Sequence, residues 1–428
     1  MWFQQQTLRR QARHPSGFVA EIADTELEES ILSRFAKIVS QFGDRVAVES
    51  STQALTFRQL DLASNRVAQT LLARRGAANE PVVMVVSSGV HHLIALYGIL
   101  KTNKCYVPLP AHTPPDRMDF ILQDLDHPLL LVDARTVEPI KAAPASALCQ
   151  QLLLDEALEQ GTGAPLNLDH ATDGLVRIQY TSGSTGQPKG VMNESRVLLC
   201  KARAIAEAVS LCHEDRLAKL GVDTPDAITC SLVGATFLSL DVQRHGVQGI
   251  IGFLAQAQAT VLRSTATAFR ELIRSLDGSL AFPHLRLVVV NGEPSTADDL
   301  RAARDHFPAG CVYSNSYAAT ETPTTAAYFA TPDSVEGLDR LPIGYPMSHV
   351  EVLLLDPERR VPTNDEVGEI VVRSRYLTHG YWKRPEQTAQ RFLPLTQRTA
   401  TNACTSPATW DDSTWTGVST TWVAKITP

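Results

Sequence analysis

Residues 180–190 read YTSGSTGQPKG, which places three glycines, two serines, two threonines and one lysine in eleven positions. The apolar run LVRIQY at 175–180 precedes this stretch and predicts a buried strand that leads directly into it. Glycines let backbone N–H groups approach an anion closely, hydroxyls add donors, and Lys189 supplies a positive charge. This context favours a phosphate-binding loop over a flexible linker, which is the commoner role of a Gly/Ser/Thr-rich segment.

The stretch does not satisfy the P-loop pattern GxxxxGK[ST]. Pro188 stands where that pattern has glycine, and Gly190 stands where it has serine or threonine. A nucleoside kinase or a GTPase is therefore disfavoured, and another class of phosphate-binding enzyme is needed to explain the loop.

Alternating strand and helix patterns predict an α/β fold. Strands are expected as near-continuous apolar runs, PVVMVVSS at 81–88 and LRLVVV at 285–290 among them, and such runs are typical of mostly parallel sheets covered on both faces. Amphipathic helices are expected over 26–43, 55–75 with Gly76 ending the second, and 194–209. The predicted divisions are a polar segment (1–25), a first αβ subdomain (26–170), a second (171–335), a small β subdomain (336–395) and a tail (396–428).

Composition narrows the class of protein further. The 428 residues carry a net charge of -7, so nucleic acid and anionic lipid are not expected partners. No apolar run approaches the roughly 20 residues of a membrane helix, and the N-terminus has no apolar signal core, so a cytoplasmic location is expected. Seven scattered cysteines without a CxxC pair predict reduced, mostly buried thiols rather than a metal clip.

The stretch at 180–190 matches the form [YF]TSGSTGxPKG throughout, and by this it resembles the phosphate loop of adenylate-forming enzymes. Six further motifs resemble those of the adenylation domains of nonribosomal peptide synthetases and their acyl ligase relatives. In chain order they are LTFRQLDLASNRVA (55–68), LKTNKCYVPLPAHTPPDRMDFIL (100–122), VVNGEPS (289–295), NSYAATETP (315–323), IGYPMSHVEVLLLD (343–356) and VGEIVVRSRYLTHGYWKRPEQTAQRF (367–392). One departure is Pro110-Ala111, where the family usually has Asp-Pro.

The resemblance implies an adenylation core of two parallel-sheet αβα subdomains and a small β subdomain. It also implies a reaction that joins a carboxylic acid to the α-phosphate of ATP, with Mg²⁺, and releases pyrophosphate. The acyl-AMP would then pass its acyl group to the thiol of a phosphopantetheine carrier protein or of a coenzyme.

The resemblance further assigns roles to residues of this sequence. Catalytic roles fall to Thr185, Lys189, Thr320, which would bond the α-phosphate, and Glu321, which would hold Mg²⁺. The phosphate loop also includes Thr181, Ser182, Gly183, Ser184 and Gly186. The wall of the adenine pocket would be Gly292, Glu293 and Pro294, and the motif that follows would supply Asn315 near the purine edge, Ser316, Tyr317 as the stacking face, and Ala318.

The acid substrate is less determined. Members that activate α-amino acids place an aspartate, within an FDxS stretch, about thirteen residues before a GA pair. Here that count from Gly234 reaches Gly221, and the nearest acid is Asp223, without the aromatic partner. The same stretch also predicts a helix start, with Thr224 as the cap and Pro225 in the first position. An amino acid, a hydroxy acid, a keto acid and a fatty acid all remain open.

The resemblance ends after Phe392. The family continues to YxTGD, whose aspartate binds the ribose, and then to a C-terminal lid with a catalytic lysine, but residues 396–428 instead hold ten threonines and three tryptophans. We expect this tail to be disordered or to result from a reading-frame shift, and we expect little adenylation by this chain alone. The alternatives are a non-catalytic nucleotide-binding or interaction protein and a lid supplied by a separate chain.

Overall fold

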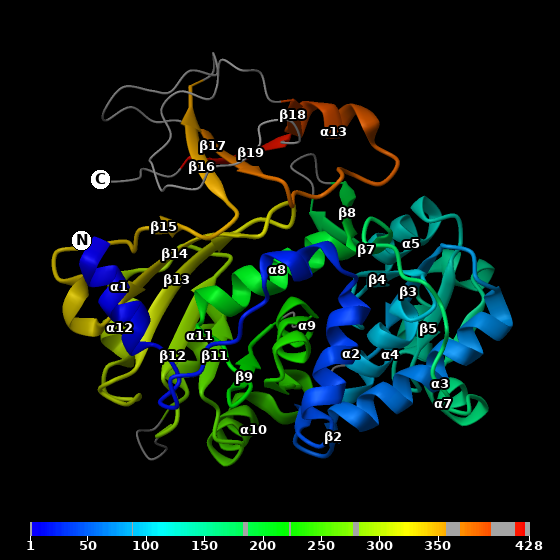
Figure 1. Ribbon diagram of the computed structural model, residues 1–428, viewed down its shortest axis with the longest axis horizontal. Coiled ribbons are helices and arrows are strands. Elements are labelled where there is room, and N and C mark those ends of the chain that lie inside the picture. Colours follow the sequence, from blue (N-terminus) through cyan, green and yellow to red (C-terminus); the bar gives the residue numbers. More distant parts are fainter. Residues whose placement is uncertain are drawn as a thin grey trace.

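The computed structural model describes residues 2–87, 89–182, 187–221, 224–276, 282–356, 369–394 and 416–423. Two large sheets stand side by side and a smaller one lies across their top (Figure 1). Strands inside the two large sheets pair in parallel, and antiparallel pairs occur only at their edges within this part of the chain. The predicted α/β class with mostly parallel sheets is confirmed.

The nine-stranded sheet contains strands from both predicted αβ subdomains. Its spatial order is β15 (Tyr345–Pro346), β14 (Thr324–Ala330), β13 (Val312–Ala318), β12 (Leu287–Asn291), β11 (Val261–Ser264), β9 (Arg216–Lys219), β10 (Thr236–Leu238), β1 (Val46–Glu49) and β2 (Ala54–Thr56). The six-stranded sheet has the order β6 (Gln151–Leu153), β5 (Leu129–Val132), β3 (Pro81–Val85), β4 (Cys105–Pro108), β7 (Leu175–Ser182) and β8 (Pro188–Glu194).

The predicted division between residues 170 and 171 does not separate these sheets. Strands β1 and β2 precede that division yet join the nine-stranded sheet, where Val48 pairs with Phe237. Strands β7 and β8 follow it yet join the six-stranded sheet, where Tyr106 pairs with Arg177. Each large sheet therefore contains one hairpin whose residues were assigned to the other predicted subdomain. The two predicted subdomains are intertwined.

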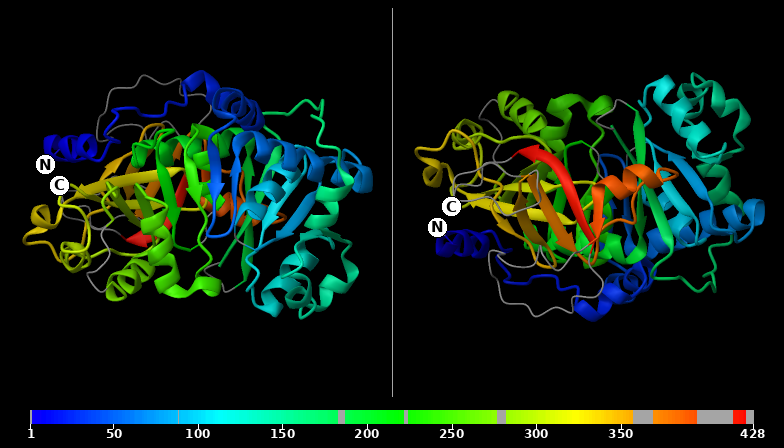
Figure 2. Two further views of the ribbon diagram at one scale, coloured as in Figure 1. Left: turned by 90° about the horizontal axis from the view of Figure 1, so that it is seen from below. Right: turned by 90° about the horizontal axis from the view of Figure 1, so that it is seen from above.

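Helices cover the faces of both sheets and fill the space between them (Figures 1 and 2). Helix α4 (Val90–Leu100) shows this, because it contacts β1 of the nine-stranded sheet as well as β3 and β4 of the six-stranded sheet. The other helices are α1 (Trp2–Gln11), α2 (Ile31–Phe42), α3 (Phe57–Arg75), α5 (Pro115–Asp124), α6 (Val137–Ile140), α7 (Leu154–Gln160), α8 (Ser195–Ala208), α9 (Thr224–Val233), α10 (Val242–Gln256), α11 (Ala266–Arg274), α12 (Ala297–Ala303) and α13 (Pro385–Arg391).

Local sequence signals explain several helix boundaries. The helix expected from residue 26 begins later, at Ile31, because Ser30 caps it by accepting a hydrogen bond from the Ser33 N–H at 3.0 Å. In α3, Thr56 and Gln59 form a capping box, and Gly76 with φ of 63° ends the helix. No helix in the described part of the chain is long and apolar enough to cross a membrane.

The small sheet contains the two strands predicted after residue 340 and two that were not predicted. Its order is β16 (Glu351–Leu355), β17 (Glu369–Ser374), β19 (Thr416–Val423) and β18 (Phe392–Pro394). Strand β19 falls in the tail for which no regular element was expected, and it pairs antiparallel with β17, with Val372 opposite Val418. Its threonine, valine and tryptophan content favours an extended strand, so the expectation for residues 416–423 is corrected.

Candidate active site

The two ends of the phosphate-loop stretch lie on the antiparallel strands β7 and β8. Thr181 pairs with Lys189 and Ser182 with Pro188, so the strands bring Lys189 next to the start of the loop. Strand β8 itself was not predicted from the sequence. Pairing with β7 gives the lysine a fixed backbone position, which a free loop would not.

Lys189, Glu321 and Tyr381 form a closed triangle of hydrogen bonds. The Lys189 ammonium donates to Glu321 Oε1 at 3.2 Å and to the Tyr381 hydroxyl at 2.8 Å. The Tyr381 hydroxyl donates to the same Glu321 Oε1 at 2.8 Å. Lys189 and Tyr381, which are 132 and 60 positions away from Glu321 in the sequence, therefore meet at one of its carboxylate oxygens. The triangle combines a cation with a potential metal ligand, as phosphate chemistry requires.

Tyr381 is fixed by its own backbone as well as by its hydroxyl. The flanking residues pair with β8, because the Trp382 N–H donates to the Gly190 carbonyl at 2.7 Å and the Met192 N–H donates to the Gly380 carbonyl at 3.0 Å. A Cβ at Gly190 would lie 2.7 Å from Ile178 Cγ2 and 3.2 Å from Trp382 Cβ, so glycine allows both neighbours to approach closely. The segment 380–382 is therefore a third strand-like partner of the hairpin.

The electrostatics of the triangle keep Glu321 ionised. Burial alone would raise the pKa of the Glu321 carboxyl, but the hydrogen bond from Tyr381 and the nearby Lys189 ammonium outweigh it and hold the pKa below its usual value. The pKa of Tyr381 is raised, first by burial and then by the Glu321 charge, so its hydroxyl keeps its proton. A carboxylate that stays charged is suited to binding a divalent cation.

A buried polar cluster supports the backbone on which Glu321 stands. Lys201 Nζ, on α8, donates to the Thr320 carbonyl at 2.5 Å and to Asn193 Oδ1 at 2.7 Å. Arg177, from β7, donates to the same Asn193 oxygen at 3.4 Å. On the other side, the Thr378 N–H donates to the Glu321 carbonyl at 3.2 Å. Burial lowers the pKa of Lys201 well below its ordinary value.

The residues expected around adenine lie at the carboxyl ends of two neighbouring parallel strands, β12 and β13. Asn315 is buried and donates to the Pro342 carbonyl at 2.8 Å, so its amide ties β13 to the segment before β15. Tyr317 is half-buried beside the small sheet, against a group that includes Ile370 and Val372. Ligands of α/β proteins bind outside such strand ends.

The turn after β12 has the conformation that its glycine allows. Gly292 has φ of 80°, and Glu293 and Pro294 are exposed beside it. The Glu293 carboxylate accepts a hydrogen bond from the Thr267 N–H at 2.8 Å, which leaves the backbone of the turn as the part that could face a purine. Ser316 is buried and Ala318 is exposed in the motif that follows.

Some expected site residues lie outside the described residues. They are Gly183, Ser184, Thr185, Gly186 and Asp223. Thr224, the proposed helix cap, is itself the first residue of α9, and its hydroxyl lies 3.0 Å from His92 Nε2. Sequence reasoning assigned no role to Tyr381, although it lies in the GYW part of a matched motif. No sequence pattern pointed to Lys201 or Asn193. A lysine in an amphipathic helix is usually exposed, so the burial of Lys201 was not expected.

The side chains at this site are suited to binding a nucleoside triphosphate together with a divalent cation. Thr181 Oγ1 is buried and has no hydrogen-bond partner among the described residues, as a donor meant for a phosphate oxygen would be. Lys189 adds a cation and Glu321 an oxygen ligand of the kind that Mg²⁺ accepts. A separate cavity of about 240 Å³ is lined by residues such as Ser87, Asp133 and Arg135 and includes none of these groups.

Comparisons with known proteins assign the chain to a family. The profile described as AMP-binding enzyme matches residues 35–382, so the chain belongs to the AMP-binding enzyme family, the adenylate-forming enzymes. It is 26% identical over 373 residues to tyrocidine synthase 1 from Brevibacillus parabrevis, which covers 85% of this chain and 33% of that protein. It is 30% identical over 384 residues to malpinin synthetase from Mortierella alpina, covering 87% of this chain and 5% of the synthetase.

The fold is also found in a solved structure from Klebsiella oxytoca. The N-terminal subdomain of Klebsiella oxytoca NpsA, in complex with 3-hydroxybenzoyl-AMSN, superimposes with a TM-score of 0.77 at 17% identity, covering 92% of this chain and 95% of that one. The predicted adenylation-core fold is confirmed. The chain spans a third or less of tyrocidine synthase 1 and malpinin synthetase.

Proposed function

We propose that this chain activates a carboxylic acid as its acyl-AMP at the expense of ATP, with release of pyrophosphate. The main support for this proposal is the triangle of hydrogen bonds among Lys189, Glu321 and Tyr381, in which Lys189 lies near the start of strand β8. It places a cation and an ionised carboxylate beside a phosphate-loop sequence, in a chain of the AMP-binding enzyme family.

Adenylation brings two anions together, so the protein must neutralise charge and align the reacting groups. In this proposal Lys189 and the hydroxyl of Thr181 bind the β- and γ-phosphates. Thr320 bonds the α-phosphate, while Glu321 holds Mg²⁺, which would neutralise phosphate charge when bound. Tyr381 orients Glu321 and Lys189 and stays protonated throughout.

We further propose that the acyl group passes to a phosphopantetheine carrier protein or to a coenzyme thiol, as the family resemblance implies. All six cysteines in the described part of the chain are buried and unpaired, which supports a cytoplasmic location where thiols stay reduced. Asp223 remains the candidate partner for the ammonium group of an amino acid substrate.

A second candidate is a protein that binds the nucleotide without catalysing adenylation. It is supported by residues 396–428, which stand where the resemblance leads to a TGD motif and do not contain it. By the resemblance, the aspartate of that motif binds the ribose, so without it ATP should bind more weakly.

One experiment separates the two candidates. ATP–pyrophosphate exchange is measured with the full chain over a panel of amino, hydroxy, keto, aryl and fatty acids, beside calorimetric titration with ATP and Mg²⁺. Exchange that depends on one class of acid supports the adenylation function and names the substrate class. Nucleotide binding without exchange for any acid supports the second candidate, and the absence of both contradicts the two together.

A further inference from the structure

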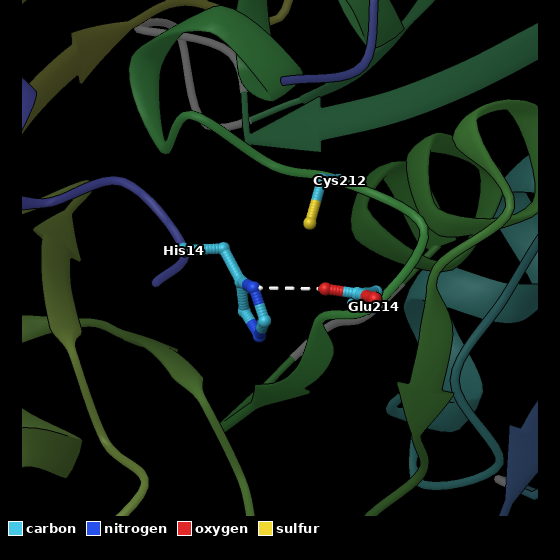
Figure 3. Close-up of side chains that lie close together, drawn as sticks. All are labelled: His14, Cys212 and Glu214. Atoms are coloured by element: carbon cyan, nitrogen blue, oxygen red, sulfur yellow. Dashed lines mark ion pairs between the residues drawn. The ribbon is translucent and has the colours of Figure 1, made fainter. Parts of the chain in front are cut away.

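A cluster of three metal-ligating side chains includes none of the residues of the candidate active site. His14 comes from the segment after α1, and Cys212 and Glu214 come from the turn between α8 and β9. One ligand atom from each of the three lies within 4.8 Å of the others. Figure 3 shows the three side chains facing a common space, with the His14 ring directed at the Glu214 carboxylate.

We propose that His14, Cys212 and Glu214 bind a zinc ion that fastens the N-terminal segment to the core. Imidazole nitrogen, thiolate sulfur and carboxylate oxygen are the three ligand types that zinc takes in proteins. A thiolate and a carboxylate together also balance the charge of a divalent ion. Binding releases the Cys212 thiol proton to solvent, and water completes the fourth position.

The distances suit this ion. Tetrahedral zinc sets its ligand atoms about 3.3 to 3.6 Å apart, given bond lengths of about 2.0 to 2.3 Å. His14 Nδ1 and Glu214 Oε2 are already 3.1 Å apart. The sulfur needs only a small approach, since all three ligand atoms fit within 4.8 Å. His14 Nδ1 also lies 2.8 Å from Ser16 Oγ and accepts a hydrogen bond from the Ser16 N–H at 3.2 Å, so zinc at this nitrogen would replace the contacts with Ser16.

The turn that carries two of the ligands is held rigidly. Asp215 accepts a hydrogen bond from the Cys212 N–H at 2.9 Å, and its own N–H donates to the Cys212 carbonyl at 3.1 Å. The Asp215 carboxylate is buried and paired with Arg286 at 2.7 Å and with the Thr260 hydroxyl at 2.7 Å. Residues 212 and 214, two positions apart, therefore keep a fixed spacing.

The segment that carries the third ligand follows the same turn. Gly17, with φ of 75°, closes a tight turn by donating its N–H to the His14 carbonyl at 2.9 Å. Three residues later, the Ala20 N–H donates to the Leu211 carbonyl at 2.8 Å. Arg286 also donates to the Ala12 carbonyl. A metal at His14 would lock a contact that these hydrogen bonds already align.

Metal titration of the full chain tests the proposal. Purified, metal-free protein is titrated with Co²⁺, whose bond to a thiolate gives a near-ultraviolet charge-transfer band, and Zn²⁺ is then added to displace it. We expect one equivalent of Co²⁺ with the band in the wild type and in C149S, which removes another buried thiol. C212S should lose the band.

Two conservative variants guard against a folding defect in C212S. Glu214→Gln and His14→Gln alter half-exposed side chains, and each should weaken zinc affinity by more than the roughly 10- to 100-fold that loss of a supporting partner costs. Zinc should also slow tryptic cleavage after Arg10 and Arg13 in the wild type but not in E214Q. Failure to take up one equivalent, a band that survives C212S, or equal zinc protection of E214Q would overturn the proposal.

Discussion

At the scale of single residues, the candidate site holds charged side chains that are largely buried. Glu321 and Lys189 have side chains 13% and 20% exposed, so neither is fully solvated. Their mutual hydrogen bond and the Tyr381 hydroxyl replace the lost water. A ligand with phosphates and a cation would compete for the same groups, which makes the triangle the part of the site that must rearrange on binding.

The lowered pKa of Glu321 gives a pH-dependent contribution to stability. Its carboxylate binds fewer protons in the folded state, so the stabilisation is complete above the unfolded pKa of about 4.3 and is lost as pH falls through the folded pKa. We expect Glu321→Gln to lower the free energy of unfolding at pH 7, with a deficit that shrinks below pH about 4. Urea titrations at several pH values measure this. The exposed Glu336→Gln variant should show no such trend, and an equal trend would contradict the assignment.

Lys201 should give a pH dependence in the same direction, but at higher pH. Because burial lowers its folded pKa well below the unfolded value of about 10.4, the unfolded chain binds more protons between the two, and stability rises with pH there. Lys201→Met removes this dependence. We expect the stability of the Met variant relative to the wild type to fall as pH rises from the folded pKa of Lys201 towards pH 10 in denaturant titrations. A constant difference across that range would show that Lys201 is charged in the folded protein.

Sequence reasoning located part of this site because motifs fix it locally. Lys189 and Glu321 were predicted from two separate motifs, and the structure brings them into one hydrogen bond. Tyr381 was not assigned a role, because its contact depends on the pairing of residues 380–382 with β8. Lys201 and Asn193 could not be found, because burial of a helix-borne lysine depends on what packs over the helix.

At the scale of elements, the segment 380–382 is the support that brings Tyr381 to the hairpin. Gly380 has φ of 111°, and a Cβ there would lie 2.3 Å from Thr388 Cγ2. We expect Gly380→Ala to cost about 2 to 5 kcal/mol, from the backbone strain and the overpacking together. Thermal or urea unfolding measures the loss.

Gly252→Ala is the matched control for this prediction. Gly252 lies within α10, and no atom lies within 4 Å of a Cβ built there. Alanine should therefore leave stability unchanged or raise it by up to about 1 kcal/mol. If Gly380→Ala and Gly252→Ala were equally stable, the close approach of Thr388 to residue 380 would not be what holds Tyr381 in place.

Helices and strands could be predicted where a long, continuous run of the sequence carries the helix or strand pattern by itself. Helix α3 was predicted almost to its ends, because a capping threonine and a terminal glycine bound an amphipathic run. Strand β8 was missed, because PKGVMNE has neither an apolar run nor a clear alternation and forms only by pairing with β7. Strand β19 was missed although its composition favours a strand, because its residues show no clear alternation and its pairing with β17 and β18 defines it.

At the scale of the whole molecule, the exchanged hairpins make the two large sheets dependent on each other. A chain cut between residues 170 and 171 would leave β1–β2 without β10 and β7–β8 without β4. We expect the fragments 1–170 and 171–428 to be unfolded or aggregated when expressed separately, and to regain a folded complex only when co-expressed. Circular dichroism and gel filtration check this. Two stable, monomeric fragments would contradict the interdependence.

Calorimetric titration of the full chain with ATP and Mg²⁺ tests the central claim most directly. We expect one nucleotide per chain, a loss of roughly 10- to 100-fold in affinity in Lys189→Ala, and a Mg²⁺-dependent loss in Glu321→Gln that disappears when the metal is chelated. The exposed Lys141→Ala variant should bind like the wild type. Binding that is unchanged in Lys189→Ala, or no binding by the wild type, would contradict the assignment of the β7–β8 hairpin and Glu321 as the triphosphate and metal site.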